Sequence, residues 1–192
     1  MYFNDIGFLT PYTEYSVVIP IVENKYFLFE IRSKFLKNQP SEVSFPGGKI
    51  EDNESPLDAG IRELYEEIGI KPKVILGKLK YLVTPFNIVI HPFIVKIECN
   101  NILLNTNEVE AIFKVPIDIF EKPLYKFEAE IKIIPPDNFP YHLIPNGKNY
   151  KWRKGKYEIM FFKYNDRIIW GLTARLAFEA YKKIKGGIRN DH

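Results

Sequence analysis

Three glutamates placed three and four residues apart could hold a divalent cation. They are Glu63, Glu66 and Glu67, and the charged residues Glu54 and Arg62 lie just upstream. Residues at these spacings share one side of a helix, where like charges repel by roughly 0.2–0.5 kcal/mol per pair. A surface helix gains nothing from that repulsion, whereas Mg²⁺ and Mn²⁺ bind oxygen ligands, usually carboxylates together with substrate phosphates. The spacing therefore indicates a divalent-cation site, with a solvated acidic surface as the alternative.

The apolar residues of the same segment predict which side of the helix is buried. At about 100° per residue, with Glu63 set at zero, Glu67 lies near 40° and Glu66 near −60°. The apolar side chains lie between roughly 100° and 160° and belong to Leu57, Ile61, Leu64 and Ile68. The two sides are nearly opposed, so we expect one to pack into a core while the carboxylates face a cleft.

Signals at both ends predict a helix over residues 56–68, just after a glycine-rich loop. Ser55 can cap the amino end, and Pro56 suits the first helical position. Gly69 suits the position after the last turn. The carboxylates should therefore stand on one regular helix.

The fixed positions from Gly48 to Ile70 resemble the Nudix box, glycine-x5-glutamate-x7-arginine-glutamate-apolar-x-glutamate-glutamate-x-glycine-apolar. They are filled by Gly48, Glu54, Arg62, Glu63, Leu64, Glu66, Glu67, Gly69 and Ile70. The resemblance implies an enzyme that splits a nucleoside diphosphate linked to another group. It also implies an α/β/α sandwich with a mixed β-sheet, in which the carboxylate helix follows the glycine-rich loop and a second helix lies near the carboxyl end.

The resemblance also implies roles for the residues of the box. Glu63, Glu66 and Glu67 would hold Mg²⁺ or Mn²⁺, aided by the backbone carbonyl of Gly48. Glu54 and Arg62 would pair with each other and support the loop and helix rather than bind metal.

A general base is expected either among the box glutamates or on a later loop. Glu108 is the first candidate on a later loop, and Glu110 is the second. Either residue could instead simply begin a helix.

The segment before the box resembles the signature of the coenzyme A pyrophosphatase branch, arginine-small-x3-arginine-x3-glycine-x3-phenylalanine-proline-glycine-glycine. Its positions hold Arg32, Ser33, Lys37, Ser41, Phe45, Pro46, Gly47 and Gly48. Lys37 stands where arginine is usual and keeps the charge without the bidentate fork. Ser41 stands where glycine is usual, and serine tolerates a positive φ less well.

This second resemblance implies a substrate. Coenzyme A or an acyl derivative would be split to 3′,5′-ADP and 4′-phosphopantetheine, with Arg32, Lys37 and Phe45 contacting it. The two departures leave ADP-ribose, a dinucleotide or another nucleoside diphosphate derivative as the alternative. A regulatory module that binds nucleotide without catalysis is the alternative of another class.

Length and composition predict one globular domain. The chain has 192 residues, of which 46% are hydrophobic and 27% charged, enough for one full core. We expect a single domain over residues 1–192, with its core at about 14–185. The net charge of +3 is too small to indicate nucleic acid as a partner. A homodimer is compatible with the sequence, which does not determine the oligomeric state.

The sequence also predicts a cytoplasmic protein without a membrane span. The single cysteine, Cys99, cannot form an internal disulfide, which suits a reducing compartment. Residues 1–15 lack a basic start followed by an apolar stretch, so no signal peptide is expected. No run of about 18 apolar residues occurs.

β-Branched and alternating stretches predict the strands. They cover residues 16–22, 26–31, 73–83, 89–98, 111–115, 125–134 and 157–163. A second helix is predicted over Leu172 to Ile184, and a short helix or turn over residues 117–120. Residues 135–156, rich in Pro, Asn, Gly and Lys, are expected to form either a substrate loop or a solvated basic loop. Strands mingled with two main helices indicate an α/β layered domain.

Overall fold

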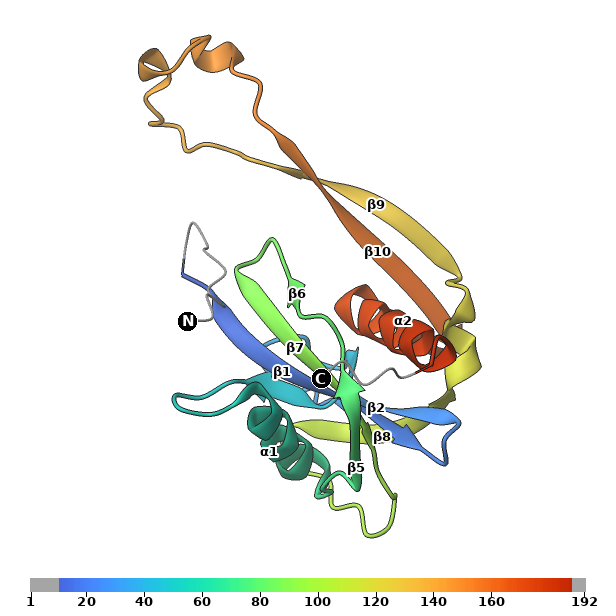
Figure 1. Ribbon diagram of the computed structural model, residues 1–192. Coiled ribbons are helices and arrows are strands. Elements are labelled where there is room, and N and C mark those ends of the chain that lie inside the picture. Colours follow the sequence, from blue (N-terminus) through green and yellow to red (C-terminus); the bar gives the residue numbers. More distant parts are fainter. Residues whose placement is uncertain (1–10, 188–192) are drawn as a thin grey trace.

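The chain folds into a mixed β-sheet with a helix on each side, which confirms the predicted α/β sandwich (Figure 1). The computed structural model describes residues 11–187. The helices are α1 (Pro56–Ile68) and α2 (Gly171–Lys185). The strands of the mixed sheet are β1 (Thr13–Val22), β2 (Tyr26–Arg32), β3 (Val43–Ser44), β4 (Gly47–Lys49), β5 (Val74–Lys78), β6 (Leu82–Val83), β7 (Ile88–Lys96) and β8 (Val109–Pro116).

One parallel pair at the centre makes this sheet mixed. Neighbouring strands follow the order β3-β2-β1-β7-β5, with β4 paired to β1, β8 to β2 and β6 to β7. β1 and β7 are parallel, from the Thr13–Ile88 pair to the Ile21–Lys96 pair. Parallel neighbours require a long crossover connection, and α1 lies within the connection between them. The topology therefore places α1 directly over the centre of the sheet.

Alternation along β1 divides the core into two layers. Val18 and Val22 point toward α1 and pack with Leu64 of that helix. Ile19 and Ile21 point to the opposite face and belong to the layer under α2. Successive side chains of a strand point to opposite faces, so a strand covered on both faces reads as an unbroken apolar run.

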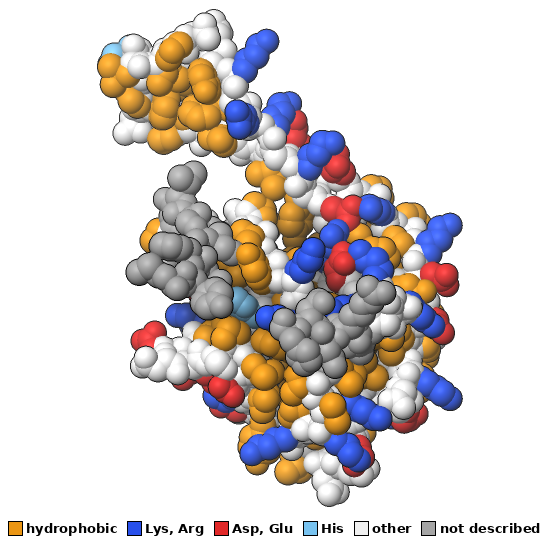
Figure 2. Space-filling view, in the orientation of Figure 1, with side chains coloured by type: hydrophobic (Ala, Val, Ile, Leu, Met, Phe, Trp, Pro, Cys, Tyr) orange, Lys and Arg blue, Asp and Glu red, His pale blue; other side chains and the backbone are white. Residues whose placement is uncertain are grey.

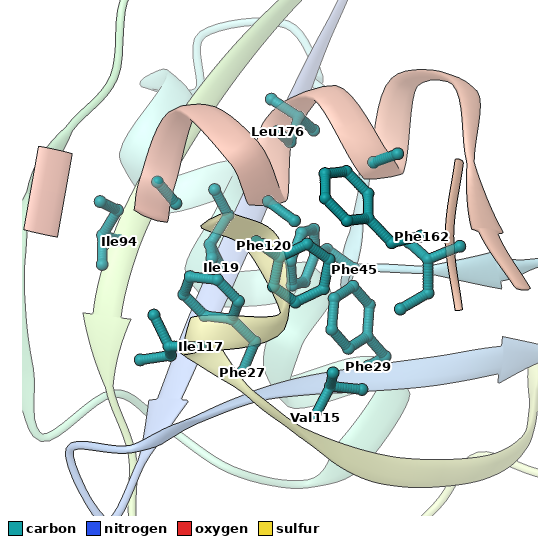
Figure 3. Close-up of a cluster of buried hydrophobic side chains, with 14 of the residues drawn as sticks. Ile19, Phe27, Phe29, Phe45, Ile94, Val115, Ile117, Phe120, Phe162 and Leu176 are labelled. Atoms are coloured by element: carbon teal, nitrogen blue, oxygen red, sulfur yellow. The ribbon is translucent and has the colours of Figure 1, made fainter. Parts of the chain in front are cut away.

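Aromatic side chains dominate the layer under α2 (Figure 3). Phe45 stacks on Phe29, with ring centroids 4.3 Å apart, and meets Phe27 edge to face at 6.0 Å. Phe120 and Phe162, from the two segments that cover this face, lie 4.9 Å apart. Such pairs each contribute about 0.5–1.5 kcal/mol beyond the burial of area. The loop that carries Phe45 is therefore anchored in the core.

A second, three-stranded antiparallel sheet was not predicted. It contains β9 (Tyr125–Lys132), β10 (Lys154–Tyr164) and β11 (Arg167–Trp170), in the order β11-β10-β9. The short 3₁₀ helix η1 (Ile117–Glu121) precedes it, which agrees with the turn predicted over residues 117–120. β9 and β10 extend beyond the body as an arm, whose tip includes η2 (Tyr141–Leu143) and η3 (Gly147–Asn149) (Figure 1).

The arm (residues 125–164) keeps the expected substrate loop away from α1. Its tip lies far from α1 (Figure 1), so residues 135–156 do not reach the carboxylate helix of the same chain. Two of the basic side chains are also paired along the arm, Lys154 with Glu130 at 2.6 Å and Lys156 with Glu128 at 2.7 Å. These observations favour the solvated basic alternative.

The strand predicted over residues 73–83 is in fact two strands, so that prediction was wrong in detail. β5 and β6 both pair with β7, but the register of the β5 ladder shifts between Ile75 and Gly77. Gly77 has a φ of 153°, and an interior glycine marks such irregularities. The short strand β11 was missed altogether.

Within residues 11–187, no helix is long and apolar enough to cross a membrane. Most of the segment in which a signal peptide was sought, residues 1–10, lies outside the described residues.

Candidate active site

Helix α1 begins and ends where the sequence predicted. The Oγ atom of Ser55 accepts a hydrogen bond from the Asp58 amide at 3.2 Å. Gly69 has a φ of 73° and donates its N–H to the Tyr65 carbonyl at 2.9 Å. The apolar side of the helix is buried through Leu64 and Ile68. The carboxylate side is thereby turned toward the glycine-rich loop.

The glycine-rich loop is tied to both the sheet and the helix. The Pro46 carbonyl accepts a hydrogen bond from the Val18 amide at 2.8 Å. The Gly47 amide donates to Oε2 of Glu67 at 3.0 Å. This second bond joins the loop to α1 at one of the expected metal ligands.

Phe45 was expected to contact substrate, and the structure corrects that prediction. Its side chain is buried, only 4% exposed, and packs against Phe27 and Phe29. A ring enclosed on these sides cannot reach a ligand. Phe45 instead positions the loop that follows it.

Glu67 is buried rather than open to a cleft, contrary to the simple helix geometry. Glu67 is only 4% exposed. This burial, together with the charges of Glu30, Glu63 and Glu108, raises the pKa of its carboxyl group. A buried carboxylate among like charges is destabilised unless a cation or a proton compensates it. The structure thus brings Glu30 and Glu108, which are distant in the sequence, together with Glu63 and Glu67 of α1.

Glu30 is the member of this group that sequence reasoning missed. It lies on β2, is 1% exposed, and accepts a hydrogen bond from Ser44 Oγ at 2.7 Å. Its other oxygen, Oε2, is buried without a hydrogen-bond partner. Burial raises the pKa of its carboxyl group, and Glu63 and Glu108 contribute in the same direction. The only sequence signal was an acid within the otherwise apolar run at residues 26–31.

Arg62 lies in the middle of the remaining box acids. Its Nε and Nη2 atoms bind the two carboxylate oxygens of Glu54 at 2.9 and 3.1 Å, and the resulting hydrogen bonds hold the pKa of Glu54 below its usual range. Its Nη1 atom also donates to Glu63 at 2.8 Å and to Glu66 at 3.0 Å. The arginine also reaches the Lys49 carbonyl at 3.1 Å. The expected Glu54–Arg62 pair is therefore formed, and it spans the loop and the helix.

The structure separates the two candidates for a general base on a later loop. The charge of Glu108 contributes to the raised pKa of Glu30, Glu63 and Glu67. Its backbone carbonyl also accepts from the Ser33 amide at 2.7 Å, which ties its loop to the end of β2. Glu110 is exposed and lies at the irregularity of the β2–β8 ladder, between Val109, which pairs with Arg32, and Ala111, which pairs with Ile31. Only Glu108 lies beside the box.

The two basic residues of the upstream segment differ in their environment. Arg32 follows Glu30 by two residues on β2, so both side chains lie on the same face, and its charge lowers the pKa of Glu30. Its Nε atom is buried without a hydrogen-bond partner. Lys37 lies exposed in the loop, and it forms no ion pair with any residue in the described range 11–187.

Ser41 adopts the backbone conformation that explains why glycine is usual at its position. Its φ is 60°, in the left-handed region that favours glycine. Its amide donates to the Arg32 carbonyl at 3.1 Å. Serine therefore adopts the left-handed backbone conformation at this position, at some cost in backbone strain.

The acids fit a hard divalent cation by type, although their present side-chain positions do not enclose one. Among residues 11–187, no three His, Cys, Asp or Glu side chains are placed to hold a metal ion together. Arg62 occupies oxygens of Glu63 and Glu66 instead. The unpartnered Oε2 of Glu30 and the buried Glu67 are the oxygen donors that Mg²⁺ or Mn²⁺ prefers.

Replacement of Gly48 by alanine is expected to lower activity without unfolding the protein. An added Cβ would overlap the carboxylate of Glu63, and that side chain can rotate away. We expect turnover to fall by roughly 10–100-fold because the carboxylate loses its supported position, with little change in thermal stability. The matched control is Gly155→Ala, whose Cβ would make an ordinary contact at 3.4 Å with Ile131. Equal turnover in both variants would show that activity does not depend on the position of the Glu63 carboxylate beside Gly48.

Comparison with known proteins identifies a family match over most of this fold. The NUDIX domain family matches residues 13–135. Nudix hydrolase 3 of Caenorhabditis elegans is 33% identical over 129 residues, which cover 60% of this chain and 53% of that protein. A peroxisomal coenzyme A diphosphatase of the same organism, ndx-8, is 35% identical over 96 residues, covering 47% of this chain and 41% of that protein. The chain thus spans about half the length of the curated relatives it matches.

A solved structure shares the fold at low sequence identity. A MutT/nudix family protein from Enterococcus faecalis superposes with a TM-score of 0.57 at 10% identity. The superposition covers 97% of this chain and 67% of that one.

Proposed function

Because the chain belongs to the NUDIX domain family, we propose that it is a metal-dependent hydrolase of a nucleoside diphosphate derivative. The observation that carries the proposal is the group of buried and half-buried acids around the loop at Gly48, namely Glu30, Glu63, Glu67 and Glu108. Acids that repel one another in this way are stabilised by a bound cation or by a proton, and a divalent cation is the partner that the family match supports. We propose that residues 14–185 act as one catalytic domain, since α2 packs on the same core as β1.

In this proposal, Glu63, Glu66, Glu67 and the Gly48 carbonyl hold Mg²⁺ or Mn²⁺, and Glu30 completes the set. The cation would supply charge neutralisation for the diphosphate and activation of a water molecule. Arg62, through its bonds to Glu54 and to the Lys49 carbonyl, holds the helix in a fixed position relative to the loop. The Glu108 carboxylate accepts the proton of the attacking water, with a box glutamate as the alternative.

The substrate that we propose is coenzyme A or an acyl-coenzyme A, split to 3′,5′-ADP and 4′-phosphopantetheine or its acyl form. Three observations support it: the signature upstream of the box, the relative named as a coenzyme A diphosphatase, and the glycine-like φ of Ser41. Arg32, beside Glu30, and the exposed Lys37 would meet substrate phosphates. The peroxisomal location in the name of that relative leaves the compartment of this chain open.

ADP-ribose or a dinucleotide is the second candidate, favoured by one observation. Lys37 stands in place of the arginine of the signature, and lysine cannot form the bidentate contact that arginine makes with a phosphate. A non-catalytic module is disfavoured because every acid of the box is present.

A side-by-side assay distinguishes these candidates. Purified protein with Mn²⁺ is given coenzyme A, an acyl-coenzyme A, ADP-ribose and a dinucleotide, and the products are separated by chromatography. We expect 3′,5′-ADP from the first two substrates and slower turnover of the others. Brisk hydrolysis of ADP-ribose with none of coenzyme A would overturn the substrate assignment. Absence of turnover on every diphosphate, with bound Mn²⁺ demonstrated, would overturn the enzyme proposal itself.

A further inference from the structure

The tip of the arm (residues 133–153, between β9 and β10) has no part in the proposed hydrolysis. It lies at the end of the arm that is far from α1 (Figure 1). A connection of this length is uncommon in a compact domain unless it is disordered or functional. This one is ordered and contains the two 3₁₀ helices η2 and η3. The tip therefore calls for a function of its own.

Four aromatic rings give the tip a small core. Phe139 meets Tyr141 at 4.9 Å and Trp152 at 5.6 Å, and Tyr150 meets Trp152 at 5.1 Å, each pair edge to face. Turn hydrogen bonds support the backbone around these rings, such as the one that the Tyr150 amide donates to the Gly147 carbonyl at 3.1 Å. The tip is thus preformed, and a partner can bind it without first ordering it.

The most exposed large apolar side chains of the tip are aliphatic. Ile134 is 87% exposed, Leu143 71% and Ile133 54%. Figure 2 shows hydrophobic side chains gathered on the tip, at the end of the arm. A single exposed apolar residue is ordinary, whereas a group of them in one place marks a surface that binds a protein, a membrane or a ligand.

The tip is also basic, and its charges are not neutralised within the described structure. Its basic residues are Lys148, Lys151 and Arg153 and its only acid is Asp137, which gives a net charge of +2. All three basic side chains are exposed, and none forms an ion pair with a residue in the range 11–187. By contrast, the lysines of β9 and of the first half of β10 each pair with a glutamate of the arm. The tip therefore offers positive charge to a negatively charged partner.

We infer that the tip binds the surface of an anionic lipid bilayer. Aliphatic side chains such as Ile134 and Leu143 enter the boundary of the acyl chains, and the basic side chains contact the anionic headgroups. Trp152 and Tyr150 are of the types that lie at the boundary between water and membrane. Lysine and arginine are long enough to keep their charge at the headgroups while their neighbours are buried. Its place at the end of a projecting arm lets the tip meet a flat surface ahead of the body (Figure 1).

Nucleic acid, the other negatively charged partner, matches the tip less well. Proteins that bind single strands stack bases on open aromatic faces, but Phe139, Tyr141 and Trp152 are half-buried against other rings of the tip. The exposed Ile134 and Leu143 have no counterpart on a phosphate backbone. A bilayer with anionic headgroups satisfies the aliphatic side chains and the unpaired cations together.

The inference is independent of the enzymatic proposal and is tested by sedimentation of the full chain with lipid vesicles. The vesicles are made of phosphatidylcholine alone or of phosphatidylcholine mixed with phosphatidylserine. We expect the mixed vesicles to bind roughly 100-fold more tightly, because each of three cations near an anionic surface contributes about fivefold. Added salt should weaken this preference, since it screens exposed charges.

Two charge variants locate the basic surface. The tip variant, which should lose most of the preference for mixed vesicles, combines Lys148→Gln, Lys151→Gln and Arg153→Gln. The matched control removes the same charge from paired lysines of the arm and should keep the preference; it combines Lys126→Gln, Lys154→Gln and Lys156→Gln.

An apolar variant tests insertion. Ile134→Glu combined with Leu143→Glu should weaken binding to mixed vesicles at least roughly 10-fold. Circular dichroism and turnover of a soluble substrate should remain unchanged, because the tip is far from α1 (Figure 1). The matched control is Leu103→Glu, a side chain of the body that is 74% exposed. In a Trp170→Phe variant, Trp152 is the only tryptophan, and its emission should move to shorter wavelength when mixed vesicles are added.

Several results would contradict the inference. Wild-type protein that stays in solution with mixed vesicles at low salt would overturn it, as would binding that survives both tip variants. Equal loss of binding in the controls would place the membrane contact elsewhere on the chain. Emission of Trp152 that does not change on bound vesicles would show that the tip stays in water. Tighter binding to a single-stranded oligonucleotide than to mixed vesicles, lost in the tip charge variant, would assign the tip to nucleic acid instead.

Discussion

Glu67→Gln is expected to reduce hydrolysis by roughly 10²–10³-fold, equivalent to about 3–4 kcal/mol of transition-state stabilisation. Glutamine keeps the shape and can still accept the hydrogen bond that the Gly47 amide donates at 3.0 Å. The substitution removes one charge from a buried group of acids, so the protein without metal should be at least as stable as the wild type. The measurements are turnover with Mn²⁺ and thermal unfolding with and without Mn²⁺.

Thermal unfolding with Mn²⁺ shows whether Glu67→Gln loses activity through metal binding or through unfolding. Wild-type protein should gain thermal stability with Mn²⁺ by mass action, and Glu67→Gln should lose most of that gain. Glu66→Gln should lose activity similarly, although its side chain is 51% exposed. Glu110→Gln, an exposed acid away from the group, is the matched control and should stay within about twofold of wild type. Turnover at the wild-type level in Glu67→Gln would remove this residue from the metal site.

Glu30→Gln is expected to weaken Mn²⁺ binding and turnover by roughly 10–100-fold. Its Oε2 atom is buried and unpartnered, so it is a free oxygen donor facing the box acids. The amide keeps an oxygen for the hydrogen bond from Ser44 Oγ at 2.7 Å and removes the negative charge. The measurements are the Mn²⁺ concentration that gives half-maximal turnover, and the Mn²⁺ dependence of thermal unfolding.

The control for this variant lies on the neighbouring loop. Glu42→Gln removes a half-buried acid whose backbone carbonyl accepts from the Arg32 amide at 2.9 Å, but whose carboxylate is outside the acidic group. We expect Glu42→Gln to bind Mn²⁺ like the wild type. If Glu30→Gln behaves like Glu42→Gln, the buried carboxylate on β2 has only a structural role.

The features that depend on nearby residues were readable from the sequence. The helix over 56–68, its Ser55 cap and its Gly69 end all follow from contacts within a few residues. The pairing of Glu54 with Arg62 was likewise anticipated, through the resemblance to the Nudix box. The apolar run of β1 predicted a strand, although not that its two faces would serve separate layers.

Only the tertiary structure decided which other residues surround the box. Glu30 lies near the acids of α1 because β2 pairs with β1. Glu108 lies near them because β8, which begins at the next residue, pairs with β2. The spacing of residues in the sequence does not predict these contacts, because strand pairing depends on the hydrophobic pattern and the turns of the entire sheet. The same reason explains Phe45, whose ring is buried against Phe27 and Phe29 of β2.

The sequence by itself determined that three acids share one side of helix α1, because residues three and four apart lie on the same helix face whatever the rest of the chain does. The tertiary structure decided that Glu67 is buried and that Glu30 joins it. Burial is a property of the assembled layers, since the same alternating strand can face a core or water. That distinction sets the charge balance of the site.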